Sequence, residues 1–208
     1  MSHPTASAPH ASTDTEPGPS PTPSHEAPVI GVAGNGGGLV GRVMPRSLLG
    51  RQLLVIGAIL GIGNVLWADE GFGVRCVEHL AQIRSFGPEV TLLDGGTQGL
   101  YLLPFLEEAD RLVVFDAVDY GLEPGTLKIV EGDEVPAFMG AKKMSLHQTG
   151  FQDVIATAQL MGYCPETLLL IGCQPEELED YGGGLRDVVA AQIAPSVQIA
   201  LPEGDGWR

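Results

Sequence analysis

Apolar and polar positions form alternating blocks along the chain after residue 50. Residues 53–60 are continuously apolar, which is typical of a strand buried on both faces of a sheet. Between residues 71 and 84 the apolar positions recur every three or four residues, with Arg75, Glu78 and Gln82 between them. This spacing predicts an amphipathic helix directly after the first strand.

The same alternation continues toward the C-terminus. It predicts strands at residues 89–93, 111–115, 126–131 and 167–171, and helices at residues 98–108, 145–161 and 185–201. Pro104 is expected to shorten or kink the first of these helices, and Pro195 to interrupt the last. Strands that alternate with helices predict an α/β fold. We expect a single domain with a five-stranded, mainly parallel, twisted sheet and helices on both faces.

The first 50 residues have a different composition. They contain half of the sixteen prolines, and the first 28 residues are rich in Pro, Ser, Thr, Ala and His. Such a segment buries too little apolar surface to offset its ordering entropy. We therefore expect a disordered extension at residues 1–50, the α/β domain at 51–202 and a short tail at 203–208. Because Met44 is an alternative start, we hypothesise that residues 1–43 are dispensable or absent from the native protein.

The net charge of the chain limits the classes of partner that it can bind. The formal net charge is −15, and nearly all of it lies after residue 50. An acidic body disfavours nucleic acids and anionic membranes but suits a basic protein or a metal cation. The N-terminus has no apolar core of a secretory signal, and no apolar run reaches the ~20 residues of a membrane span. We therefore expect no membrane insertion.

The three cysteines are Cys76, Cys164 and Cys173. Their number is odd and no Cys-x-x-Cys pair exists, which excludes a disulfide framework and a four-cysteine zinc site. We expect buried, reduced thiols and a cytoplasmic location.

Carboxylates follow each of the first three predicted strands. Asp69 and Glu70 come after the first strand, Asp94 after the second and Asp116 after the third. In a parallel sheet, ligands bind beyond the carboxyl ends of the strands. The sequence therefore places these side chains where a site is expected.

An imidazole is predicted near the same edge. Ser145 and Gln148 form a capping-box pattern at the start of a helix, which puts His147 in the first turn. The helix dipole disfavours imidazolium there, and a neutral imidazole is the form that binds metals. Two carboxylates and one imidazole would give nickel or zinc three ligands and leave positions open.

Each of these residues also has a purely structural interpretation. Asp69 and Glu70 could cap the following helix. Asp94 could brace its glycine turn, which is the interpretation we prefer for it. Asp116 could be an ordinary strand-end residue, and His147 an ordinary surface or cap residue.

Other catalytic motifs are weak or missing. Gly61 and Gly63 follow the first strand, but Leu66 stands where a dinucleotide fingerprint has its third glycine. The sequence contains no Gly-x-Ser-x-Gly, His-Glu-x-x-His or Walker motif. Cys76 lies in a predicted helix without a plausible base beside it, so a cysteine nucleophile is not expected.

Four segments, in order, resemble the nickel–iron hydrogenase maturation endopeptidases. They are LGIGNVLWADEGFG at residues 60–73, LDGGT at 93–97, VFDA at 114–117 and SLHQ at 145–148. The resemblance covers about residues 53–195 and implies the α/β fold of that family. In the family a Glu, an Asp and a His bind metal, and these carry over to Glu70, Asp116 and His147. The long N-terminal extension lies outside the resemblance.

The resemblance implies an activity and a partner. It implies an endopeptidase, classed as aspartic-type, that removes the C-terminal extension of a nickel-loaded hydrogenase large-subunit precursor. The sequence has no twin Asp-Thr-Gly motifs, which argues against a shared-proton carboxylate dyad. The nickel would be carried by the substrate, and Glu70, Asp116 and His147 would be both metal-binding and catalytic, with roles that the sequence does not separate. Asp94 would support the site or its turn.

Two other functions remain open at this point. One is a chaperone that senses nickel in the large subunit without cutting it. The other is an unrelated metal- or nucleotide-dependent hydrolase.

Overall fold

The computed structural model describes residues 57–139 and 146–201, with backbone alone at residues 137–139 and 146–149. The predicted extension at residues 1–50, the tail at 203–208 and the capping residue Ser145 lie outside the described residues.

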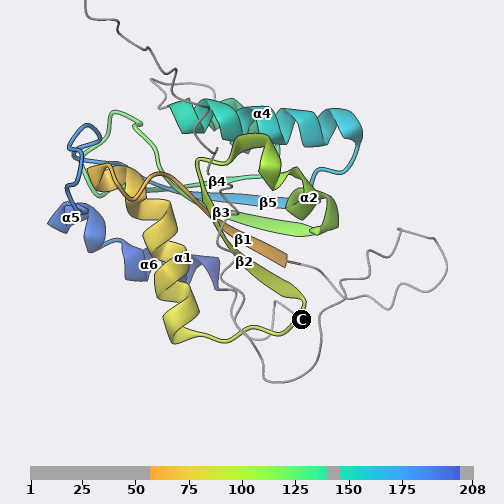
Figure 1. Cartoon of the computed structure of the whole chain (residues 1–208), viewed down its shortest axis with the longest axis horizontal. Helices are drawn as coiled ribbons and strands as arrows, with labels where there is room; N and C mark the ends of the chain where they lie inside the picture. The colour runs from red at the N-terminus through yellow and green to blue at the C-terminus, as the bar shows by residue number, and fades with distance from the viewer. Residues whose placement is uncertain (1–56, 140–145, 202–208) are drawn as a thin grey trace, which may run out of the picture.

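A five-stranded sheet forms the centre of the molecule (Figure 1). The strands are β1 (Gly57–Ile62), β2 (Val90–Gly96), β3 (Arg111–Ala117), β4 (Leu127–Glu131) and β5 (Thr167–Cys173). Their order is β2-β1-β3-β5-β4, and all neighbours are parallel except β4, which is antiparallel to β5. The predicted α/β fold with a mainly parallel sheet is therefore confirmed.

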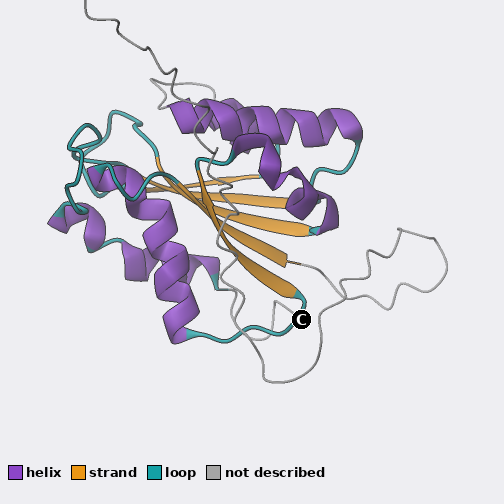
Figure 2. Cartoon of the chain, in the orientation of Figure 1, coloured by secondary structure: helices purple, strands orange, loops and turns teal. Residues whose placement is uncertain are grey.

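Helices cover both faces of the sheet (Figure 2). The helical elements are η1 (Ala68–Gly71), α1 (Phe72–Ile83), η2 (Gly99–Leu102), α2 (Leu103–Glu108), α3 (Glu134–Met139), α4 (Leu146–Met161), α5 (Asp187–Ala190) and α6 (Ile193–Ala200). Helices α1 and α6 pack on one face, and α2 and α4 on the other (Figure 1). Each face has its own apolar core, because the central strands are buried on both sides.

The boundaries differ from the sequence predictions at the carboxyl ends of the strands. β2 and β3 continue beyond the expected residues 93 and 115, so Asp94 and Asp116 lie within strands rather than after them. The predicted strand at 53–60 is described only from Gly57, and it ends at Ile62. Strand pairing sets these ends, and pairing partners cannot be read from local hydrophobicity.

Two predicted helices are each divided. The helix predicted at 98–108 is η2 followed by α2, with Pro104 in the first turn of α2. The helix predicted at 185–201 is α5 followed by α6, and Pro195 lies in the first turn of α6 rather than at the break. Proline is tolerated at a helix start, where its missing N–H has no intrahelical partner.

The strand order reverses at β1. β2 lies on one side of β1 and β3 on the other, and the chain leaves β1 through α1 on one face but reaches β3 through α2 on the opposite face. In open parallel sheets such a reversal opens a crevice at the carboxyl ends of the strands. The fold therefore predicts a site where β1 and β3 end.

Candidate functional site

Glu70 and Asp116 both lie at the carboxyl edge of the sheet, where β1 and β3 end. Glu70 belongs to η1, which follows β1 and contacts β3. Asp116 is the next-to-last residue of β3, beside Gly172 of β5. A Cβ on Gly73 would collide with the backbone of Phe115 and Ile62, so the start of α1 packs directly on the strand ends. The fold therefore brings two of the three predicted ligands to one edge of the sheet.

The two carboxylates have different environments. Glu70 is half-buried, and desolvation raises the pKa of its carboxyl group above the usual range. Asp116 is fully buried. Burial, and next the charge of Asp116, raise the pKa of the Tyr120 phenol. Burial therefore disfavours negative charge on these groups, and a bound cation would offset that cost.

The third predicted ligand is His147, whose side chain lies outside the described residues. Its backbone is in the first turn of α4, and α4 begins at the end of the molecule where β1, β3 and β5 end (Figure 1). Gly150, one turn later, lies against Gly99 of η2, the element that follows β2. Among the side chains that are described, no three His, Cys, Asp or Glu residues could hold a metal ion. The three-residue metal centre therefore stays a prediction that depends on His147.

Asp69 has a role that the sequence did not reveal. Its side chain does not cap α1, whose N-cap residue is Gly71. Instead Oδ2 accepts hydrogen bonds from the amides of Glu176 and Glu177, both at 2.9 Å, and Oδ1 accepts one from the amide of Arg186 at 2.7 Å. The capping interpretation of Asp69 was therefore wrong. Its fully buried carboxylate fastens η1 to the loop after β5, more than one hundred residues away in the chain.

The backbone before Glu70 is also tightly held. Ala68 has φ +29°, a value that few non-glycine residues adopt and that costs roughly 1–3 kcal/mol. Gly63 has φ +130°, and a Cβ there would collide with the carbonyl oxygen of Glu70. That same oxygen accepts a hydrogen bond from the amide of Asn64 at 3.2 Å. The peptide of Glu70 is thus fixed against the glycine loop that follows β1.

Asp94 supports its own turn, as preferred from the sequence. Its half-buried carboxylate accepts a hydrogen bond from the Gly96 amide, and its carbonyl oxygen accepts one from Nε2 of Gln98 at 3.2 Å. Burial raises the pKa of this carboxyl group, and the Gly96 hydrogen bond partly opposes that shift. These bonds make Asp94 a brace for the loop beside the crevice.

Two of the three thiols are poorly suited to act as nucleophiles. Cys76 and Cys173 are fully buried, and desolvation raises the pKa of Cys173 to about 12, with the charge of Asp69 adding to the effect. The pKa of Cys76 is raised well above its usual value for the same reason. Because the thiolate is the reactive form, burial and the raised pKa values disfavour a nucleophilic role for both residues. The expectation of buried thiols is confirmed for both, whereas Cys164 is only half-buried.

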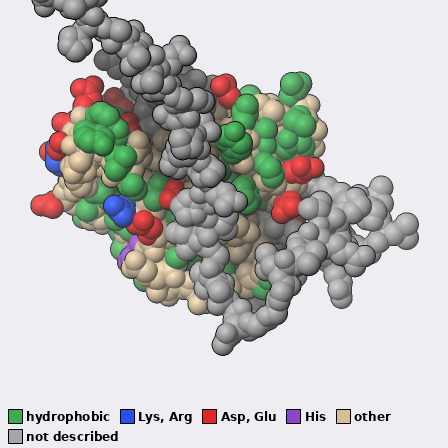
Figure 3. All heavy atoms as spheres, viewed as in Figure 1, with side chains coloured by type: hydrophobic (Ala, Val, Ile, Leu, Met, Phe, Trp, Pro, Cys, Tyr) green, Lys and Arg blue, Asp and Glu red, His purple; other side chains and the backbone are tan. Residues whose placement is uncertain are grey.

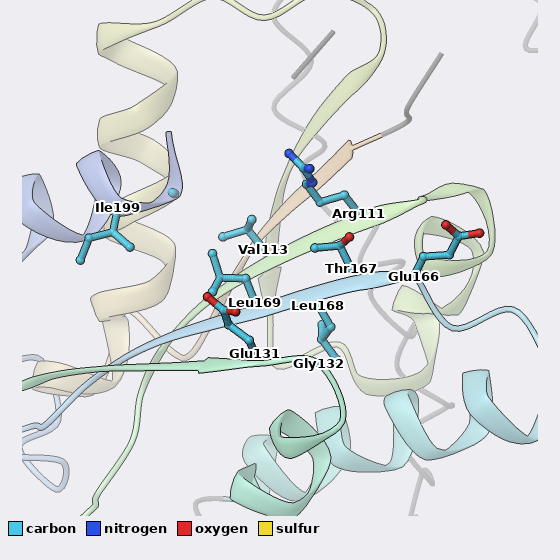
Figure 4. Close-up of a pocket in the computed structure, with 10 residues that line it drawn as sticks. Arg111, Val113, Glu131, Gly132, Glu166, Thr167, Leu168, Leu169 and Ile199 are labelled. Carbon is cyan, nitrogen blue, oxygen red and sulfur yellow. The ribbon is translucent and has the colours of Figure 1, made fainter. Parts of the chain in front are cut away.

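A cavity of about 450 Å³ lies at the opposite edge of the sheet (Figure 4). Its lining includes Arg111 and Thr167, the first residues of β3 and β5, together with Glu131 and Glu166. It is therefore separated from Glu70 and Asp116 by the length of the strands, and it is not part of the candidate site. None of the described helices combines the length and the apolar character that a membrane span requires.

The molecule is an α/β protein with acidic side chains at the carboxyl edge of a mainly parallel sheet. A family model described as "Hydrogenase maturation protease" matches residues 74–203. The chain is 70% identical to the hydrogenase expression/formation protein HupD of Rhodobacter capsulatus, over 72% of this chain and 71% of that protein. It is 41% identical to the hydrogenase 2 maturation protease of Escherichia coli, over 69% of this chain and 87% of that protein.

Solved structures of hydrogenase maturation proteases also resemble this chain. The hydrogenase maturating endopeptidase HybD of E. coli superposes with a TM-score of 0.67 at 39% identity, over 71% of this chain and 90% of that one. A nickel–iron hydrogenase maturation protease, HybD, of Thermococcus kodakarensis superposes with a TM-score of 0.58 at 26% identity, over 70% and 97% of the two chains. The chain belongs to the hydrogenase maturation protease family.

Proposed function

We propose that this protein is the endopeptidase that removes the C-terminal extension of a nickel-loaded hydrogenase large-subunit precursor. Membership of the maturation protease family supports peptidase activity and a hydrogenase large subunit as substrate. The observation that supports the site assignment is that Glu70, in η1 against β3, and Asp116, near the end of β3, both lie at the carboxyl edge of the sheet where the strand order reverses. Catalysis in the cytoplasm remains the expectation from the sequence.

The nickel belongs to the substrate in this proposal. Glu70, Asp116 and His147 contact the metal once the precursor carries it, so that only loaded precursor gains their binding energy. A metal held at this crevice would polarise the scissile carbonyl or lower the pKa of a bound water. Metal-free precursor would lack both the affinity and the activation, which makes cleavage a check on nickel insertion.

The environments of the two carboxylates suggest separate roles. Glu70 also contacts the metal, but it is partly accessible and its pKa is raised, so of the two carboxylates it is the one suited to take a proton from the attacking water as well. Asp116 is fully buried in β3 and suits a fixed contact to the metal. This division uses two carboxylates in different roles and differs from the shared-proton dyad of aspartic proteases.

Incubation of the purified protein with nickel-loaded and metal-free precursor tests the proposal. Mass spectrometry should show loss of the C-terminal extension from the loaded precursor alone. The variants E70Q, D116N and H147A should each abolish cleavage. Glu166→Gln is the matched control, because Glu166 is exposed at the opposite edge of the sheet and its loss should leave the rate unchanged.

The competing functions predict other outcomes. A non-cleaving nickel-sensing chaperone would bind loaded precursor without any loss of mass. An unrelated hydrolase would neither bind nor cut it. Near wild-type cleavage by H147A would refute the proposed metal contact even if the peptidase activity is real.

A further inference from the structure

Two loops that lie far apart in the chain form one surface beside Glu70. The first is the β1–η1 loop, residues 63–67, and the second is the loop after β5, residues 174–186. The amide of Gly182 donates a hydrogen bond to the carbonyl oxygen of Leu66 at 2.7 Å, and Trp67 and Tyr181 form an isolated antiparallel bridge. The rings of Trp67 and Tyr181 meet edge to face, with 5.2 Å between centroids. We call these two segments the two-loop surface.

The buried residue Asp69 links the two loops of this surface by hydrogen bonds. Its carboxylate accepts three amide hydrogen bonds from the second loop, and its own amide donates to the carbonyl oxygen of Glu177 at 3.0 Å. A buried carboxylate is costly unless such donors surround it. The two-loop surface is therefore a rigid, preformed unit.

The surface presents apolar side chains to water. Leu66 is 53% exposed, Tyr181 67% and Val65 39%. The first loop is fixed in this arrangement, because Oδ1 of Asn64 accepts the amide hydrogen bond of Leu66 at 3.0 Å and its carbonyl oxygen accepts that of Trp67. A rigid scaffold that keeps neighbouring apolar side chains exposed is typical of a binding surface.

Negative charge borders the apolar side chains. Residues 176–187 contain five acidic residues and a single base, Arg186, which pairs with Asp180 at 2.9 Å. Glu176 and Glu179 are exposed. Figure 3 shows a patch of apolar side chains bordered by carboxylates on the left side of the molecule, where Figure 1 draws η1 and the loop after β5. Such a border favours a positively charged partner.

The two-loop surface adjoins the candidate site. Val65 lies against Gly71, and the amide of Asn64 donates to the carbonyl oxygen of Glu70. A polypeptide whose scissile bond reaches Glu70 has this surface directly beside it. The position of the surface beside the site and its acidic border both indicate that it binds part of the polypeptide that is cut.

We propose that the two-loop surface binds a segment of the large-subunit precursor, rich in apolar and basic side chains, next to the bond that is cut. This inference rests on the proposed function and adds the substrate segment that the protein recognises. Binding there would orient the scissile bond while the residues at the crevice act on it.

Steady-state cleavage of nickel-loaded precursor by L66S and Y181S tests the inference. KM should rise roughly tenfold for each variant, since each loses most of an apolar contact, and kcat should change little. Leu160→Ser is the matched control: Leu160 is 88% exposed near the end of α4, and KM should not change. For the double variant E176Q/E179Q, KM should depend less steeply on salt concentration than for the unaltered protein.

Direct binding of the same precursor, measured by calorimetry, separates the two proposals. If the unaltered protein binds but does not cut, the peptidase proposal fails, and weaker binding by L66S and Y181S would still support the two-loop surface. If the unaltered protein cuts and both variants bind and cut equally well, the surface inference is wrong while the proposed function stands. Equal effects of L66S and L160S would also overturn it.

Discussion

Replacement of Asp69 by alanine tests whether one carboxylate holds the two loops together. The alanine variant loses the acceptor for three amide hydrogen bonds, from Glu176, Glu177 and Arg186, at 2.9, 2.9 and 2.7 Å. The variant D69N should remove only part of these interactions. Its amide oxygen can still accept the bonds at the Oδ2 position, but its NH₂ group would face the Arg186 amide, donor against donor.

The expected loss of stability follows from these bonds. A hydrogen bond to a charged group contributes about 1.5–3 kcal/mol, and a buried donor left unsatisfied costs about 1–3 kcal/mol. Water can replace part of the loss at the surface loop, and removal of a buried charge relieves its desolvation cost. We therefore expect D69A to lower the free energy of unfolding by about 3–5 kcal/mol and D69N by about 2 kcal/mol. For a domain of this size the larger loss corresponds to a Tm lower by about 10–20 °C.

Urea denaturation followed by circular dichroism gives the free energy, and hydrogen exchange gives its location. Exchange in D69A should accelerate in peptides covering residues 64–73 and 174–186 and stay unchanged in α4. Asp153→Ala is the control, because Asp153 is exposed on α4 and its loss should change stability by less than about 0.5 kcal/mol. A loss below about 1 kcal/mol in D69A, or unchanged exchange in both loops, would refute the reasoning.

Three further predictions concern the site and its support. Burial raises the pKa of Glu70, so the ionised carboxylate destabilises the fold. At pH 7, E70Q should therefore have a larger free energy of unfolding than the unaltered protein. Urea titrations should show this difference fading as the pH falls toward 4.5. Iodoacetamide at pH 8 should label Cys164 and spare Cys173, as peptide mapping would show; rapid labelling of Cys173 contradicts its burial. G73A should lose about 3 kcal/mol by overpacking, whereas G184A, with open space at its Cβ, should melt like the unaltered protein.

The local pattern of apolar and polar residues was sufficient to predict the class of fold. Continuous apolar runs marked the buried strands, and the period of 3.6 marked α1 and α4, because both signals arise within a few residues of chain. One-turn elements such as η1 and α3 escaped prediction, since four to six residues carry too little periodicity. The antiparallel direction of β4 also escaped, because direction depends on pairing with β5.

The residues of the candidate site were also predictable only in part. The sequence pointed to Glu70, Asp116 and His147 through their positions after strands and at a helix start, and through resemblance to a family. It misread Asp69, a residue next to Glu70 with the same kind of side chain. Nothing in the local sequence separates a helix cap from a carboxylate that binds amides more than one hundred residues away.

The main strands and helices, and the side chains that could carry chemistry, were predictable from the amino-acid sequence, because propensity, periodicity and charge are local properties. Tertiary packing set the strand order that puts β1 between β2 and β3, the burial of Asp116 beside β5, and the hydrogen bonds by which Asp69 joins two distant loops. Those facts depend on strand order and long-range hydrogen bonds, which form when the whole chain packs.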